Sequence, residues 1–321
     1  MLTVMLSAPY MNSLMSRFQP VFDHYNIKVI LPQVFERMEE EDLLPYAGQV
    51  DGVICGDDRF SARVLNCFAP RLKVLSKWGT GVDSIDRLAA AELGIQVRNT
   101  SNAFTLPVAD TVMGYMLAFA RRLHWMDAAM KAGVWKKIPG RSLSECTLGV
   151  IGVGNIGKAV IRRARSFGMK LVANDIIPIA PDFILENGVE LTSLRDLMGW
   201  ADFISVNCDL NPTSLHIINS ESLSWCQPQA VLINSARGPL VDELALIAAL
   251  QSGRIAGAAL DVFEVEPLPL DSPLRKMENV MLASHNANSS PSAWERVHWN
   301  TLRNLVDGLG LDPGDITRFS E

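Results

Sequence analysis

Three residues of different chemistry follow short apolar runs in the second half of the chain. Arg237 follows "VLINSA", Glu266 follows "AALDVFEV" and His285 follows "NVMLAS". A histidine can exchange a proton near neutral pH, a glutamate on its other ring nitrogen orients the imidazole and favours its charged form, and the planar fork of arginine matches a carboxylate. Together they suit oxidation of an alcohol beside a carboxylate. The structural alternatives are a histidine ending a buried strand, a solvated loop glutamate and a surface salt bridge.

The elements around these residues follow an alternating pattern. Several short runs are apolar on successive residues, which is typical of parallel strands covered on both faces. Helical segments between them end at Gly94, Gly168 and Gly253, where glycine can close a helix. The pattern predicts an α/β fold of two doubly wound, Rossmann-like parallel-sheet domains. Besides an N-terminal strand, we expect strands at residues 27–30, 51–55, 73–78, 147–154, 170–175, 203–208, 230–236, 256–263 and 279–284.

Two interruptions divide the chain. "RNTSNAFTLP" near residue 100 precedes a long apolar helix at 108–122, and "NANSSP" after His285 precedes a last helix that begins around Ser292. The expected domains are 1–100 with 289–321, and 101–288. If the last helix packs on the first domain, the chain crosses twice and leaves an interdomain cleft, a usual place for a ligand.

A glycine-rich turn predicts the cofactor. In "TLGVIGVGNIGKAV", Gly152, Gly154 and Gly157 lie between a buried strand and an amphipathic helix, which is the context that gives this spacing meaning. They permit a tight turn, close approach of a pyrophosphate and close packing of helix on strand. Asp175 ends the next strand, where a carboxylate would accept hydrogen bonds from the adenosine ribose and favour NAD over NADP. The alternative for Asp175 is a turn or capping aspartate.

Composition excludes other classes of protein. The formal charge of −6 argues against nucleic acid or anionic membranes as partners. The N-terminus lacks the cationic start of a signal peptide, and no apolar run reaches the roughly 18 residues that span a bilayer. The scattered Cys55, Cys67, Cys146, Cys208 and Cys226 indicate neither a disulfide framework nor a metal site, and fit a reducing cytoplasm.

At this point the chain resembles the D-isomer-specific 2-hydroxyacid dehydrogenases, which include phosphoglycerate dehydrogenase. The resemblance covers nearly the whole chain and is most specific in "LINSARGPLVDELALIAALQSGRIAGAALDVFEVEPLPLDSPL". It implies an NAD-dependent oxidoreductase that transfers hydride between C2 of a small 2-hydroxy or 2-keto acid and nicotinamide. His285 would be the general acid/base, Glu266 would support it, and Arg237 would bind the substrate carboxylate and carbonyl.

The resemblance also implies the binding residues. The first domain would bind substrate and the second the dinucleotide, and the protein would be a cytoplasmic homodimer associating through the 108–122 region with Trp125 and Trp135, for which a core helix is the alternative. Glyoxylate or hydroxypyruvate reduction, phosphoglycerate dehydrogenation and an NADH-sensing corepressor-like protein remain alternatives. The cofactor residues would be Gly152, Gly154, Asn155, Ile156, Gly157, Asp175, Cys208, Ser235, Ala236 and Asp261, and the substrate residues Lys77, Trp78, Gly79, Thr80, Gly81 and Phe104.

The chain departs from the family pattern at several positions. "CGDD" stands where Arg-Ser is common, Lys77 and Trp78 precede the Gly-Thr-Gly loop, Phe104 replaces an asparagine, and Ala287 replaces a glycine between Asn286 and Asn288. An Asp57–Asp58 pair would oppose a phosphate by roughly a kcal/mol per close contact. The chain stops soon after its last helix, so we expect no appended regulatory domain.

Overall fold

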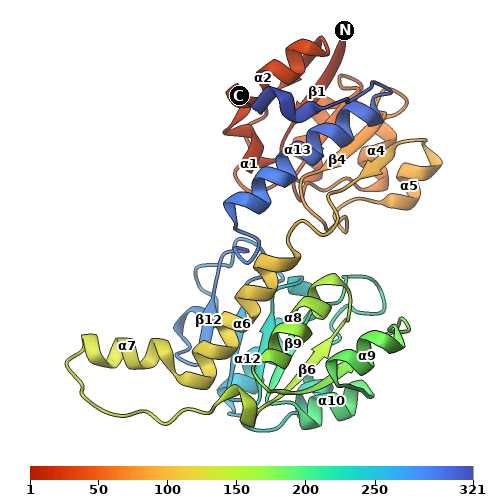
Figure 1. Ribbon diagram of the computed structural model, residues 1–321. Helices are drawn as coiled ribbons and strands as arrows, with labels where there is room; N and C mark the ends of the chain where they lie inside the picture. Colours follow the sequence, from red (N-terminus) through yellow and green to blue (C-terminus); the bar gives the residue numbers. More distant parts are fainter. Residues whose placement is uncertain (321) are drawn as a thin grey trace. The chain divides into compact units, whose positions relative to one another are not determined.

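The computed structural model describes residues 1–320, and the chain divides into two compact units (Figure 1). The first unit combines Met1–Phe104 with the segment from Ser290 onward, and the second is Thr105–Ser289. Within residues 1–320 the strands form two parallel sheets, one of five strands and one of seven. Each unit therefore has its own sheet and its own core.

The first unit is a doubly wound sheet in the order β2-β1-β3-β4-β5. Strands β3 and β4 are buried along their whole length, because helices cover both faces of the sheet. The strands are β1 Leu2–Leu6, β2 Ile27–Ile30, β3 Gly52–Cys55, β4 Val74–Lys77 and β5 Gln96–Arg98. The helices are α1 Pro9–Asn12, α2 Met15–His24, α3 Glu40–Leu43, α4 Ala62–Phe68, α5 Arg87–Glu92 and α13 Pro291–Gly308.

Helix α13 joins the C-terminal segment to the first unit. It lies along β4 (Figure 1), and the Ser76 hydroxyl donates to the Thr301 carbonyl across 2.7 Å inside the core. Val297, Leu302 and Leu305 of α13 are completely buried. The last helix of the chain therefore completes the fold of the N-terminal residues.

The second unit has the sheet order β12-β11-β10-β9-β6-β7-β8. Its central strands β6, β9, β10 and β11 carry apolar residues on both faces, as parallel strands covered by helices require. The strands are β6 Thr147–Ile151, β7 Lys170–Asn174, β8 Val189–Leu191, β9 Phe203–Val206, β10 Val231–Asn234, β11 Gly257–Leu260 and β12 Val280–Leu282. The helices are α6 Thr105–Arg121, α7 Leu123–Lys131, α8 Asn155–Ser166, α9 Pro181–Asn187, α10 Leu194–Trp200, α11 Ser220–Ser224 and α12 Glu243–Gln251.

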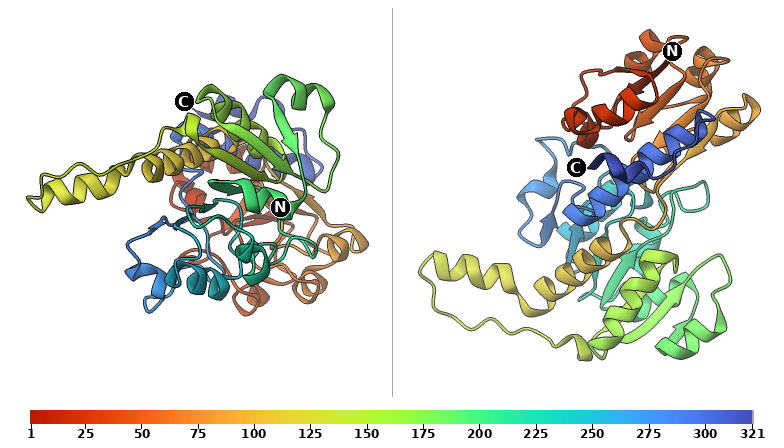
Figure 2. Two further views of the ribbon diagram at one scale, coloured as in Figure 1. Left: turned by 90° about the horizontal axis from the view of Figure 1, so that it is seen from below. Right: turned by 45° about the horizontal axis from the view of Figure 1, so that its top comes forward.

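Helix α7 and the segment after it form an arm, residues 122–140, which projects from the body of the second unit (Figures 1 and 2). No residue of α7 is buried, and Met130 and Trp135 are 51% and 88% exposed. The base of the arm is closed by a hydrogen bond of 2.8 Å, which the Arg141 backbone amide donates to the Ala120 carbonyl. The arm thus leaves and rejoins the body at neighbouring points.

The predicted fold class of two doubly wound parallel-sheet domains is confirmed. The expected strands all occur, whereas the three-residue edge strands β5 and β8 were not predicted. Among the described helices, none combines the length and apolar character needed to cross a membrane.

Candidate active site

The glycine-rich turn lies between β6 and α8 in the second unit. Gly152 has φ +87°, and a Cβ there would lie 2.5 Å from the backbone nitrogen of Cys208. A Cβ on Gly157 would lie 2.1 Å from the Gly152 carbonyl oxygen. Only glycine permits this packing of turn, helix and neighbouring loop.

The start of α8 is suited to an anion. Its N-cap is Gly154, which has no side chain to accept from the first amides, and a Cβ placed there would meet no heavy atom within 4 Å. The first turn of a helix has amides without intrahelical acceptors and a partial positive charge. Asn155 and Ile156 are the first helical residues, so their amides belong to this group. These features fit the pyrophosphate of a dinucleotide.

Asp175 follows β7 and is half-buried. Its carboxylate accepts from the Val153 amide at 2.6 Å and from the Ile177 amide at 2.8 Å. It therefore stabilises the glycine-rich turn, which is the turn role considered from the sequence. A carboxylate has about four lone-pair sites, so the same group retains acceptor capacity for ribose hydroxyls.

Two further residues follow β9 and β10, the next two strands beyond β6 in the sheet. Cys208 follows β9 against Gly152, and burial raises the pKa of its thiol to about 11, so it is a neutral, apolar lining group. Ser235 follows β10, and its hydroxyl is buried without a hydrogen-bond partner among the described residues. A buried hydroxyl without a partner is costly unless a ligand or water binds it. This residue also fits a cofactor groove.

His285 and Glu266 form a hydrogen-bonded pair. The Nδ1 atom of His285 lies 3.0 Å from Oε2 of Glu266, and the side chains are 25% and 23% exposed. The other carboxylate oxygen, Oε1, accepts from the Phe263 amide at 2.9 Å. Both oxygens of the Glu266 carboxylate are therefore fixed, and the carboxylate can orient the ring of a histidine that acts as a base.

Asp261 directly follows β11 and fixes the loop that carries His285. Its carboxylate, 1% exposed, accepts from the amides of Asn286 and Ala287 at 2.8 and 2.9 Å, and its carbonyl accepts from the His285 amide at 2.7 Å. Burial raises the pKa of Asp261, while these amides and the His285 charge oppose the rise. The loop beside the histidine is therefore held by an aspartate that the sequence assigned to the cofactor.

Arg237 follows β10 at the same edge of the sheet and is half-buried. Its Nη1 donates to the Ala236 carbonyl at 2.8 Å. Asn234, which the sequence analysis did not select, holds this loop. Its side-chain nitrogen donates to the Arg237 carbonyl at 2.8 Å, and its side-chain oxygen accepts from the Ala236 backbone amide at 3.1 Å. The sequence could have indicated this role, because Asn234 is a short amide side chain at the end of a buried strand, three residues before the arginine.

The expected substrate residues lie in the first unit: Lys77 ends β4, residues 78–81 follow it, and Phe104 comes after β5. The Lys77 side chain is 4% exposed and its ammonium lies 2.8 Å from Asp57. Trp78 donates from Nε1 to Nδ1 of His298 at 3.0 Å and packs against Phe104 with ring centroids 5.7 Å apart. The carbonyl of Gly79 accepts from the Thr100 amide, and Asn99 donates to the Thr80 carbonyl, so Gly79, Thr80 and Gly81 form a pinned loop.

The expectation that Asp57 and Asp58 together oppose a phosphate is wrong for Asp58. Asp58 is completely buried and accepts from the Ser7 hydroxyl at 2.6 Å, the Met38 amide at 2.7 Å and the Gly56 amide at 3.2 Å. Its carboxylate fixes three segments inside the first unit. The spacing of two adjacent aspartates does not show that their side chains point in opposite directions.

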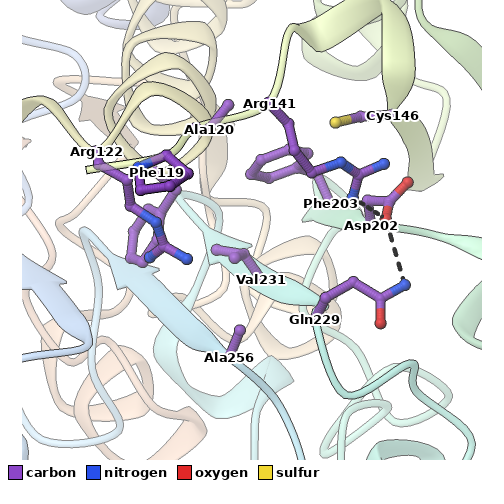
Figure 3. A pocket seen from close by; sticks show the side chains of 12 residues that line it. Phe119, Ala120, Arg122, Arg141, Cys146, Asp202, Phe203, Gln229, Val231 and Ala256 are labelled. Atoms are coloured by element: carbon purple, nitrogen blue, oxygen red, sulfur yellow. Dashed lines mark hydrogen bonds and ion pairs between the residues drawn. The ribbon is translucent and has the colours of Figure 1, made fainter. Parts of the chain in front are cut away.

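A cavity of about 190 Å³ lies at the opposite, amino-terminal edge of the seven-stranded sheet. Its walls include Phe203, Val231 and Ala256, which stand at or before the starts of β9, β10 and β11. Figure 3 shows Arg141 and Gln229 converging on Asp202, whose carboxylate lies 2.5 Å from Arg141. Arg141 and Gln229 both bind Asp202, and the cavity is remote from the strand ends that carry His285 and Arg237.

Comparison with known proteins identifies the family. Residues 113–287 match the NAD-binding domain of the D-isomer specific 2-hydroxyacid dehydrogenases. A glyoxylate reductase from Korarchaeum cryptofilum is 40% identical over 244 residues, 74% of this chain and 73% of that protein. A D-3-phosphoglycerate dehydrogenase from Methanocaldococcus jannaschii is 40% identical over 265 residues, 81% of this chain but only 50% of that protein.

A solved structure extends the likeness to both units. The D-lactate dehydrogenase from Aquifex aeolicus, complexed with NAD and lactic acid, superimposes with a TM-score of 0.83 at 27% identity, covering 94% of this chain and 93% of that one. The chain belongs to the D-isomer specific 2-hydroxyacid dehydrogenase family. It is an NAD-dependent oxidoreductase that acts on a CH–OH group.

Proposed function

We propose that this enzyme interconverts a small, unphosphorylated 2-oxo acid and its D-2-hydroxy acid, with His285, Glu266 and Arg237 as its catalytic residues. The observation that carries the proposal is the His285–Glu266 pair, 3.0 Å apart, on the same sheet edge as Arg237 and the glycine-rich turn. Carboxyl ends of parallel strands border the ligand site in open α/β sheets. An acid/base pair and a carboxylate-binding arginine therefore belong to one site.

The residues divide the work of the reaction. Bound NADH supplies the hydride that C2 of the oxo acid receives. Glu266 holds Nδ1 of His285, so that Nε2 transfers a proton to the substrate oxygen in reduction and takes it back in oxidation. Arg237 holds the substrate carboxylate through its planar fork and polarises the adjacent carbonyl. Asp261 keeps the His285 loop in place through two amide bonds.

We assign substrate binding to the first unit and dinucleotide binding to the second. Lys77, Trp78, Gly79, Thr80, Gly81 and Phe104 form one connected group at the end of β4. Asp57 already neutralises the Lys77 ammonium, which disfavours a phosphate on the substrate and supports a small tail such as that of glyoxylate, hydroxypyruvate or pyruvate.

A panel of 2-oxo acids tests the proposal. NADH oxidation should be measured with glyoxylate, pyruvate, hydroxypyruvate and 3-phosphohydroxypyruvate, followed by NAD reduction with the D and L forms of the preferred product. We expect turnover of an unphosphorylated acid and oxidation of the D form alone. NADH binding without turnover of any acid would contradict the proposal and favour a dinucleotide sensor.

We further propose a cytoplasmic homodimer. The arm, residues 122–140, exposes Leu123, Met130 and Trp135, and a second copy of the chain would bury them. Five free cysteines agree with a reducing compartment. Sedimentation equilibrium of the wild type and of Trp135→Glu tests the association, since only the wild type should be dimeric; cell fractionation tests the location.

A further inference from the structure

A second histidine–glutamate pair stands beside the one in the active site. The Nε2 atom of His216, in the loop between β9 and α11, lies 2.5 Å from Oε1 of Glu264. Glu264 is two residues before Glu266 in the chain. His216 and His285 have φ +50° and +51°, a left-handed conformation that is uncommon outside glycine and often found at functional sites.

The segment shared by the two pairs determines where the Glu266 carboxylate points. Oε1 of Glu266 accepts from the Phe263 amide at 2.9 Å, while Oε2 reaches His285. A movement of the Phe263 backbone therefore moves the carboxylate that holds the histidine. The position of residues 263–264 is thus part of the geometry of the acid/base pair.

Residues 263–264 are fixed from two sides. On one side they touch the Arg237 loop, because a Cβ on Gly238 would lie 1.8 Å from the Phe263 carbonyl oxygen. On the other side the Glu264 amide donates to Oε2 of Glu243 at 3.4 Å. Burial raises the pKa of Glu243, and the charge of Glu264 raises it further. The two carboxylates repel each other, so Glu264 needs a donor to keep it in place.

His216 is that donor and is itself anchored. Its backbone amide donates to the Pro239 carbonyl at 2.9 Å, and its carbonyl accepts from the Asn219 side chain at 2.9 Å. It therefore connects the 207–219 loop, the Arg237 loop and the Glu266 segment. We propose that His216 and Glu264 are a positioning pair that holds Phe263–Glu266 so that Glu266 meets the His285 ring. The inference rests on the proposed function of His285 and Glu266.

Substitutions of Glu264 test the pair. Glu264→Ala should lower kcat about tenfold, an effect within the usual range of coupled contacts, with KM for the oxo acid and Kd for NADH within about twofold. The pH profile of kcat should move toward that of Glu266→Gln. Glu264→Gln keeps an oxygen acceptor for His216 and should retain at least about a third of wild-type kcat. Glu186→Ala, an exposed glutamate of α9, is the control.

A double-mutant cycle separates positioning from a general loss of stability. His216→Ala and Glu264→Ala should each lower kcat, and the double variant should lose no more than either one. Additive losses, or a fall in Tm with kcat and its pH profile unchanged, would overturn the proposal.

Nuclear magnetic resonance tests the pair without turnover. The imidazole nitrogen resonances of His285 should shift in Glu264→Ala and stay in place in Glu264→Gln and Glu186→Ala. Unshifted resonances in Glu264→Ala would refute the positioning role. A wild-type enzyme inactive on every 2-oxo acid would instead refute the proposed function, so the two failures are distinguishable.

Discussion

The carboxyl ends of the two parallel sheets carry similar ionisable groups, which the two units use differently. In the first unit, Asp58 is completely buried among three donors and Lys77 is paired with Asp57. In the second unit, the side chains of His285 and Glu266 remain about one quarter exposed, and the backbone of His285 is left-handed. The first arrangement stabilises a fold, whereas the second leaves accessible the pair that we propose to transfer the proton. Variants of the two edges should therefore change different properties.

The largest effect is expected at His285. His285→Ala removes the proposed proton donor and should lower kcat by about 10²–10⁴-fold, the usual contribution of a general acid/base. Kd for NADH and Tm should stay close to wild type, because the glycine-rich turn is untouched. Steady-state NADH oxidation, fluorescence titration of NADH and thermal unfolding measure the three quantities. Full activity in this variant would show that the carboxyl edge of the second sheet does not differ from that of the first by carrying the acid/base residue.

Asp58 should show the opposite behaviour. Asp58→Ala leaves the Ser7 hydroxyl and the Met38 and Gly56 amides without their acceptor. The free energy of unfolding should fall by about 3 kcal/mol, since each unsatisfied buried donor costs roughly 1–3 kcal/mol and entering water restores part. Urea denaturation measures the loss. At a temperature where the variant is folded, kcat should remain within about threefold of wild type. A loss of kcat as large as that of His285→Ala would instead show that Asp58 takes part in catalysis.

His298 sharpens the comparison through pH. Burial lowers its pKa from 6.5 to about 4, so in acid the unfolded chain takes up the proton first. The contribution of neutral His298 to the free energy of unfolding is therefore fully present above pH 6.5 and is lost as pH falls toward 4. Between pH 7 and 5 the loss should be about 2 kcal/mol.

The matched variant for this prediction is His298→Gln. Its side-chain oxygen can still accept from Nε1 of Trp78, but it does not titrate, so the His298 contribution to the pH dependence should disappear. Urea denaturation at pH 7 and pH 5 compares the two proteins. Equal pH dependence in both would show that the histidine is not responsible.

The sequence predicted the central strands and the glycine-rich turn well, because continuous apolar runs and special glycines reflect local requirements. It missed β5 and β8, which are three residues long and half-exposed at sheet edges, where hydrophobic patterning is weak. It indicated that His285 and Glu266 are partners, because both residues follow strands that end at the same edge of the sheet. It could not foresee the buried direction of Asp58 or the His216–Glu264 pair, because these depend on long-range packing of loops.

The closed base of the arm has a consequence for the architecture of the chain. Because the Arg141 amide bonds the Ala120 carbonyl, and Arg141 also bonds Asp202, residues 122–140 begin and end at one point on the body. The arm contains no strand of either sheet, so strand pairing does not set its length or its exposed residues. The sheet edge that carries His285 and Arg237 is therefore built without any residue of the arm.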